Sequence, residues 1–131
     1  DVAVQKLNVT MLIDHAGFVG EDGQTHQGLF DIAALLPVPG MTLLAPADDV
    51  ELKQMLAFAY LYGEPLAIRY PAKICRSFGA EFRFGVWRRM NEISSDIALL
   101  AVGGRCLGRC GNTCVAEYCG GGLQLFDVEA L

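Results

Sequence analysis

Three short apolar runs in the first half of the chain predict buried strands. They span residues 7–14, 41–46 and 65–71, and each is bounded by glycine, proline or aspartate. The stretch between the first two, residues 29–36, is apolar on most sides and predicts a short helix that ends at Pro37. With a helix also predicted before the third strand, the order indicates an α/β fold with a parallel sheet flanked by helices, because parallel neighbours need a crossover connection.

The second helix, predicted over residues 47–63, has the clearest local signals. Asp48 and Glu51 have the spacing of a capping box, in which each end satisfies a backbone N–H of the first turn. Gly63 is placed to end the helix. Its apolar face is predicted to contain Leu52, Met55, Leu56 and Ala59.

The second half of the chain has weaker patterns and predicts a second, smaller α/β unit. The expected elements are a strand or ribbon over 82–91, a strand over 94–104, a helix over 107–119 and a strand over 120–131. We therefore expect a first domain at residues 1–91, a linker at 92–95 and a truncated second unit at 96–131. One strand, one helix and one strand are too few to be stable alone, so we expect a fragment or a chain that leans on a partner.

Composition narrows the classes of partner. The 131 residues have a formal net charge of -5 and are 53% hydrophobic, which predicts a packed core and disfavours nucleic acid or an anionic membrane as a partner. No apolar run reaches the roughly 18 residues that span a bilayer, and the first residues lack a signal-peptide layout. A cytoplasmic protein that acts on a small molecule is the expectation.

The five cysteines do not predict a disulfide framework, because their number is odd and four of them crowd into residues 106–119. Cys106, Cys110 and Cys114 repeat every four residues and would share one face of the predicted helix. Metal sites usually use tighter pairs of cysteines, so we interpret these as small buried thiols rather than ligands and predict no metal site.

Candidate chemistry lies in the glycine-rich stretch "GFVGEDGQTHQG", residues 17–28. It follows a predicted strand and leads into a predicted helix, the place where ligands collect in open α/β sheets. The positive end of that helix would favour a neutral His26 that binds a substrate oxygen, with Asp22 as its support. From spacing alone, a solvated surface turn explains the same residues.

The combination of "DGQTHQGLFD", "PGMTLLAPADDVELKQML" and "PLAIRYP" resembles the pyrimidine-binding domain of transketolase-like thiamine diphosphate enzymes, and among them the 1-deoxy-D-xylulose-5-phosphate synthases. The resemblance covers residues 5 to about 71. Downstream, "SSDIALLAVGG" and "LFDVEAL" resemble the first two strands of the C-terminal transketolase domain.

The resemblance implies the condensation of pyruvate with glyceraldehyde 3-phosphate, a step of isoprenoid precursor and thiamine biosynthesis. It also implies thiamine diphosphate and Mg²⁺ as cofactors of the complete enzyme and a homodimer or a complementary diphosphate-domain chain as partner. Asp22 and His26 take the place of the family residues that face the substrate channel and assist proton transfer.

Two departures concern the acceptor's phosphate. The family has arginines where this chain has His15 and Ala72, and neither replacement offers the same bidentate geometry. Lys73 and a protonated His15 are the candidates left for this contact. The family's cofactor-activating glutamate, stacking aromatic residue and metal ligands lie upstream of the matched segment.

Because those groups are missing, we expect the chain to bind no cofactor and to be inactive alone. The alternatives are a non-catalytic remnant that dimerises, and a subunit of a split transketolase.

Overall fold

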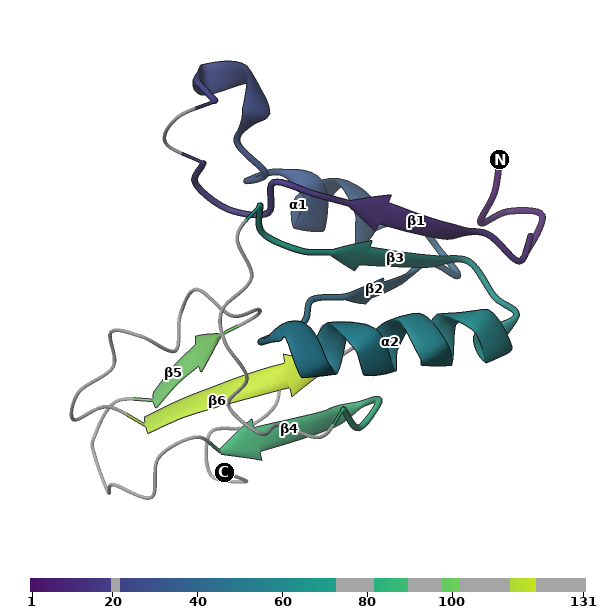
Figure 1. Cartoon of the computed structure of the whole chain (residues 1–131). Coiled ribbons are helices and arrows are strands. Elements are labelled where there is room, and N and C mark those ends of the chain that lie inside the picture. The colour runs from purple at the N-terminus through teal and green to yellow at the C-terminus, as the bar shows by residue number, and fades with distance from the viewer. Residues whose placement is uncertain (20–21, 73–81, 90–97, 102–113, 120–131) are drawn as a thin grey trace.

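The computed structural model describes residues 1–19, 22–72, 82–89, 98–101 and 114–119 (Figure 1). Its first part has the predicted alternation of strands and helices. The elements are β1 (Thr10–Ile13), the short 3₁₀ helix η1 (Gln24–His26), α1 (Asp31–Leu35), β2 (Thr42–Leu44), α2 (Asp49–Tyr62) and β3 (Leu66–Arg69). The three predicted strands and both predicted helices of this part are confirmed.

These three strands form one parallel sheet in the order β1-β3-β2. Strand β3 is central, so Leu66 lies opposite Thr10 on one side and Thr42 on the other. The crossover from β1 to β2 runs in the opposite sense to the crossover from β2 to β3. Right-handed connections therefore place α1 and α2 on opposite faces of the sheet, as Figure 1 shows. The predicted parallel sheet flanked by helices is confirmed.

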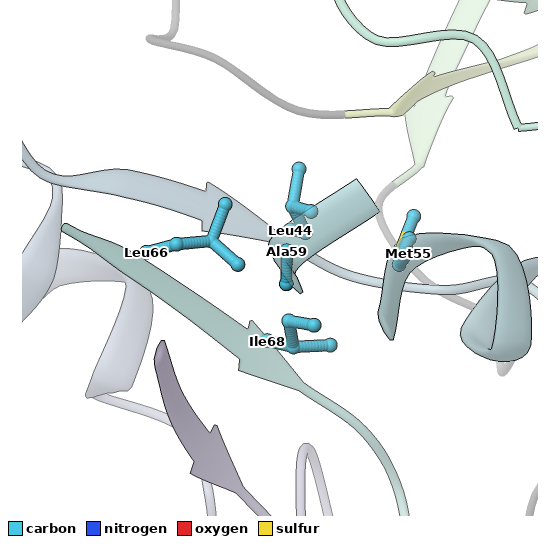
Figure 2. Packing of buried hydrophobic residues seen from close by; sticks show 5 residues of the cluster. All are labelled: Leu44, Met55, Ala59, Leu66 and Ile68. Atoms are coloured by element: carbon cyan, nitrogen blue, oxygen red, sulfur yellow. The ribbon is translucent and has the colours of Figure 1, made fainter. Parts of the chain in front are cut away.

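Helix α2 covers one face of the sheet and forms the core with it. Its buried Met55 and Ala59 pack against strand residues, and the cluster consists of Leu44, Met55, Ala59, Leu66 and Ile68 (Figure 2). The predicted helix start is confirmed, because the Asp48 carboxylate accepts a hydrogen bond from the Glu51 backbone N–H at 2.8 Å. Glu51 in turn accepts from the Ala47 N–H, and Gly63 ends the helix with a left-handed φ of 75°.

Aromatic residues of α2 extend the core. The rings of Phe58 and Tyr62, one turn apart, have centroids 4.9 Å from each other. Phe58 contacts Phe82 and Phe84 and Tyr62 contacts Phe84, with ring-centroid separations between 5.0 and 5.8 Å. The Phe82 backbone N–H also donates to the Gln54 side chain at 2.7 Å. These contacts tie the segment that precedes β4 (Val86–Arg89) to helix α2.

A second sheet has the order β4-β6-β5, with β5 at Ala98–Ala101 and β6 at Cys114–Cys119. Strand β6 runs parallel to β5 and antiparallel to β4. The predicted strands over 82–91 and 94–104 are confirmed at β4 and β5. Strand β4 lies in the predicted first domain, and its partner β6 lies in the predicted second unit. The domain boundary at residues 92–95 stays a prediction.

The predicted helix over residues 107–119 is wrong where the structure describes it. Residues 114–119 form β6, which is hydrogen bonded along both edges. Val115 and Tyr118 have strand propensity, and pairing with two neighbours outweighs the four-residue cysteine spacing. Cys75, Cys106, Cys110 and the strand predicted over 120–131 lie outside the described residues.

Candidate functional site

The candidate site is the loop between β1 and α1, which is closed at its base by backbone hydrogen bonds. The Gly28 N–H donates to the carbonyl oxygens of His15 and Gly17 at 3.1 and 3.0 Å, and the Gly17 N–H donates to the Gly28 oxygen at 2.9 Å. The Ala16 N–H donates to the Tyr70 oxygen just beyond β3. Residues 17–28 therefore form a loop with a fixed neck at the carboxyl end of the sheet.

Glycine at position 28 is required by the closeness of the two arms of the neck. A Cβ atom at Gly28 would collide with the His15 carbonyl oxygen and lie 2.9 Å from the Ala16 Cα atom. Both obstacles are backbone atoms, which cannot rotate away as a side chain does. Any larger residue must open the neck.

A buried ion pair holds the returning arm of the loop against the sheet. Arg69, at the end of β3, donates from Nε to the Asp31 carboxylate at 2.7 Å, and their side chains are 9% and 11% exposed. Its Nη2 group donates to the Gly28 oxygen at 3.1 Å. The Asp31 carboxylate also accepts from the Ile32 N–H in the first turn of α1. One guanidinium thus links the sheet, the loop neck and the helix.

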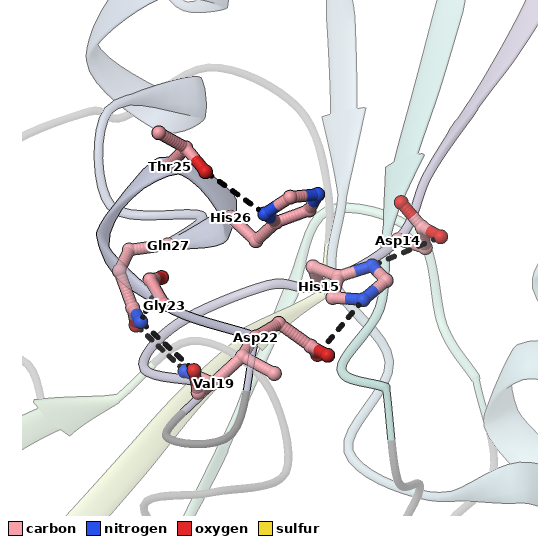
Figure 3. Close-up of polar contacts among 8 residues, drawn as sticks. All are labelled: Asp14, His15, Val19, Asp22, Gly23, Thr25, His26 and Gln27. Atoms are coloured by element: carbon pink, nitrogen blue, oxygen red, sulfur yellow. Dashed lines mark hydrogen bonds and ion pairs between the residues drawn. The ribbon is translucent and has the colours of Figure 1, made fainter.

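Inside the loop, the Gln27 side chain acts as a cross-brace. Its amide accepts from the Val19 N–H at 2.7 Å and donates to the Val19 oxygen at 2.8 Å, as a paired strand would. The same amide nitrogen lies 2.9 Å from the Gly23 oxygen. These bonds join Val19 to Gly23 and Gln27, which lie on either side of residues 20 and 21 in the sequence (Figure 3).

His15 stands at the mouth of the neck between two carboxylates. Its Nδ1 atom is 3.0 Å from Asp14 and its Nε2 atom 3.3 Å from Asp22, so both ring nitrogens face an acid (Figure 3). The hydrogen bond to Asp14 and the negative charges of Asp14 and Asp22 raise the pKa of His15 above its ordinary value of 6.5, against an opposing effect of desolvation. The backbone of His15 has a left-handed φ of 59°, and backbone strain of this kind is common at functional sites.

His26 lies beside this cluster, on the exposed 3₁₀ turn η1. The His15 and His26 ring centroids are 6.0 Å apart. The Thr25 hydroxyl is 3.0 Å from His26 Nδ1, so Nε2 is the ring nitrogen left to face a ligand. With Nδ1 as acceptor, Nε2 carries a proton to donate; with Nδ1 as donor, Nε2 accepts.

The structure brings three of the four candidate residues together, although in a different pairing from the one expected. Asp22 contacts His15, whereas Asp22 was predicted to support His26. His26 also lies on η1 rather than at the start of α1, which begins at Asp31, so the helix dipole does not explain its chemistry. Lys73 lies outside the described residues, and Ala72 is exposed.

Four residues that shape the site went unnoticed in the sequence. They are Asp14, Gln27, Asp31 and Arg69. An arginine at the end of an apolar strand and an aspartate directly after "GLF" were available signals, because a charge in a buried element requires a partner. In the described part of the chain, no three metal-binding side chains converge on a point suited to a metal ion. That same part contains no helix with the length and apolarity of a membrane span.

Comparison with known families matches residues 1–77 to the family described as transketolase, pyrimidine binding domain. Curated relatives are named 1-deoxy-D-xylulose-5-phosphate synthase. Those of Campylobacter jejuni subsp. doylei and Clostridium perfringens are each 43% identical over 107 residues, which is 79% of this chain. The match spans 17% of the length of each relative.

Two solved structures share the fold. The transketolase of Campylobacter jejuni subsp. jejuni superposes with a TM-score of 0.70 at 23% identity, over 91% of this chain and 21% of its own. A chain titled "Split gene transketolase, inactive beta4 tetramer" gives 0.68 at 24% identity, over 88% of this chain and 41% of its own. With its parallel sheet, its loop after β1 and the match over residues 1–77, this chain belongs to the transketolase pyrimidine-binding domain family.

Proposed function

We propose that the chain supplies the substrate-side loop of a thiamine diphosphate-dependent enzyme of the 1-deoxy-D-xylulose-5-phosphate synthase type. The observation that carries the proposal is the cluster of Asp22, His15 and His26 on a loop with a fixed neck. The identity of 43% with synthases over this region supports the same reaction class. The reaction is the condensation of pyruvate with glyceraldehyde 3-phosphate.

In this proposal His26 contacts substrate through Nε2. The ring is exposed and its other nitrogen is engaged by Thr25, so the ring plane is held while Nε2 exchanges a hydrogen bond with a substrate oxygen. A histidine suits this task because it gains or loses a proton near neutral pH. His26 therefore assists proton transfer at the oxygen it binds.

Asp22 acts through its contact with His15. Its carboxylate is 46% exposed and 3.3 Å from His15 Nε2, so it anchors the loop and presents a negative edge to the channel. The hydrogen bond to Asp14 and the charges of Asp14 and Asp22 raise the pKa of His15 and so favour its cationic form, in which both N–H groups already have acceptors. To bind the acceptor's phosphate, His15 must exchange one carboxylate for the phosphate; Lys73 stays a second candidate for that contact.

Thiamine diphosphate supplies the carbanion chemistry when bound, with Mg²⁺ at its diphosphate. The described residues do not include a donor set for the metal, so the groups assigned here are those on the substrate side. We propose that the cofactor is held together with a second copy or a complementary chain, and that this chain alone is inactive.

The test is steady-state kinetics of the holoenzyme with His26→Ala and His26→Gln. We expect kcat to fall roughly 100-fold or more in His26→Ala, the usual range for the loss of a general acid or base, with cofactor affinity near wild type. His26→Gln keeps hydrogen bonding without proton transfer, so it should restore binding of substrate but not kcat. Loss of cofactor affinity in His26→Ala instead would contradict a substrate-side role.

A second candidate function is a subunit of a split transketolase. It is supported by the fold shared with the split-gene chain, of which this chain covers 41%. Activity that appears only when a separate diphosphate-domain chain is added would favour this reading, and activity of a single longer polypeptide would contradict it. A non-catalytic dimerising remnant would show association without turnover in either experiment.

A further inference from the structure

Arg69 is buried and contacts the neck of the loop of residues 17–28 at Gly28. Its Nε group donates to Asp31 at 2.7 Å and its Nη2 group donates to the Gly28 oxygen at 3.1 Å. A guanidinium is planar and forked, so it fixes the positions of two acceptors relative to each other. With both members of the ion pair about nine-tenths buried, neither Arg69 nor Asp31 is placed to touch a substrate.

The two residues that Arg69 contacts, Gly28 and Asp31, are close in sequence to the exposed His26. Gly28 follows His26 by two residues, and Asp31 begins α1 three residues later. Arg69 therefore holds the returning arm of the loop at two points. The outgoing arm is held separately, by the bond from the Ala16 N–H to Tyr70, the neighbour of Arg69.

We propose that Arg69, acting through Asp31 and Gly28, is the positioning residue that sets where His26 and Asp22 stand relative to His15. Its importance for catalysis rests on the proposed function, but the geometry it controls exists without turnover. Lysine is not equivalent at this position, because a single compact ammonium group reaches Asp31 without the fixed fork that also holds Gly28.

The experiment is nuclear magnetic resonance of the full chain, comparing wild type with Arg69→Lys and Asp31→Asn. The groups that face His15 are Asp14, Asp22 and the His26 ring. When the returning arm slips, Asp22 moves away and the pKa of His15 falls toward the value that Asp14 alone sustains. Exchange of the Gly28 amide proton should accelerate about tenfold or more, because its neck hydrogen bonds open more often.

A double variant separates positioning from general loss of stability. In an Asp22→Asn background, Arg69→Lys should lower the pKa of His15 no further, because both changes remove the same contact. Arg83→Lys, the same chemical change at an exposed position outside the loop, is the control and should leave the titration and the exchange unchanged. Additive effects of Arg69→Lys and Asp22→Asn would overturn the proposal.

Unchanged His15 titration and Gly28 exchange in both Arg69→Lys and Asp31→Asn would also overturn it, whatever the activity. In the holoenzyme we expect Arg69→Lys to lower kcat with a smaller effect on KM. If the loop measurements change while kcat does not, the positioning role is supported and the proposed function is the part that fails.

Discussion

Replacing Gly28 with alanine tests whether the loop neck is as tightly closed as its geometry indicates. The added methyl group meets backbone atoms on the opposite arm, including the Ala16 Cα atom at 2.9 Å and the His15 carbonyl carbon at 3.0 Å. Overpacking of this kind costs about 1–3 kcal/mol, and each neck hydrogen bond that opens costs about 1 kcal/mol more. We expect a loss of roughly 2–4 kcal/mol.

Urea unfolding of Gly28→Ala measures the total cost, and amide exchange of the Gly17 N–H shows whether the neck is where it arises. Gly23→Ala is the matched control in the same loop, because a Cβ atom there meets nothing within 4 Å. Gly23 has a φ of 77° and a ψ of -176°, a backbone region that is essentially restricted to glycine, so its alanine variant bears backbone strain of about 1–3 kcal/mol without a close contact. Equal losses in the two variants, with unchanged Gly17 exchange in Gly28→Ala, would refute the close-contact argument.

Two further predictions concern charge and capping. Folding raises the pKa of His15. The contribution of His15 to the free energy of unfolding is therefore fully present below pH 6.5 and is lost as the pH rises through the folded-state pKa. Urea unfolding from pH 5 to 9 should show this loss in wild type and not in His15→Gln. Asp48→Ala removes the buried acceptor of the Glu51 N–H, so the free energy of unfolding should fall by about 1–2 kcal/mol. Lys53→Ala, on the exposed side of α2, should change it by less than about 0.5 kcal/mol. A pH-independent difference between wild type and His15→Gln, or equal losses for Asp48→Ala and Lys53→Ala, would contradict these two arguments.

The elements that the sequence predicts well are those whose signals are local. Helix α2 is defined by Asp48 and Glu51 at its start and Gly63 at its end, all within the helix and its caps. Strand β6 illustrates the opposite case, because it exists through pairing with β4 and β5, and the cysteine spacing gave no information on those neighbours.

The candidate site likewise has features that local sequence predicts and features that depend on distant residues. Its candidate residues are recognisable in the loop motif, but the contact between His15 and Asp22 depends on the path of the loop. That path is set at Gly28 by a backbone contact with His15 and by Arg69, which is 41 residues away in sequence. No pattern within the loop encodes a partner at that distance.

The closed neck has a consequence for how such a loop can evolve. Because Gly17 and Gly28 are hydrogen bonded to each other, the ends of the loop stay together whatever lies between them. Substitutions within the loop can therefore change its exposed surface without displacing β1, β3 or α1. The sheet can therefore be inherited unchanged while the sequence of the loop varies.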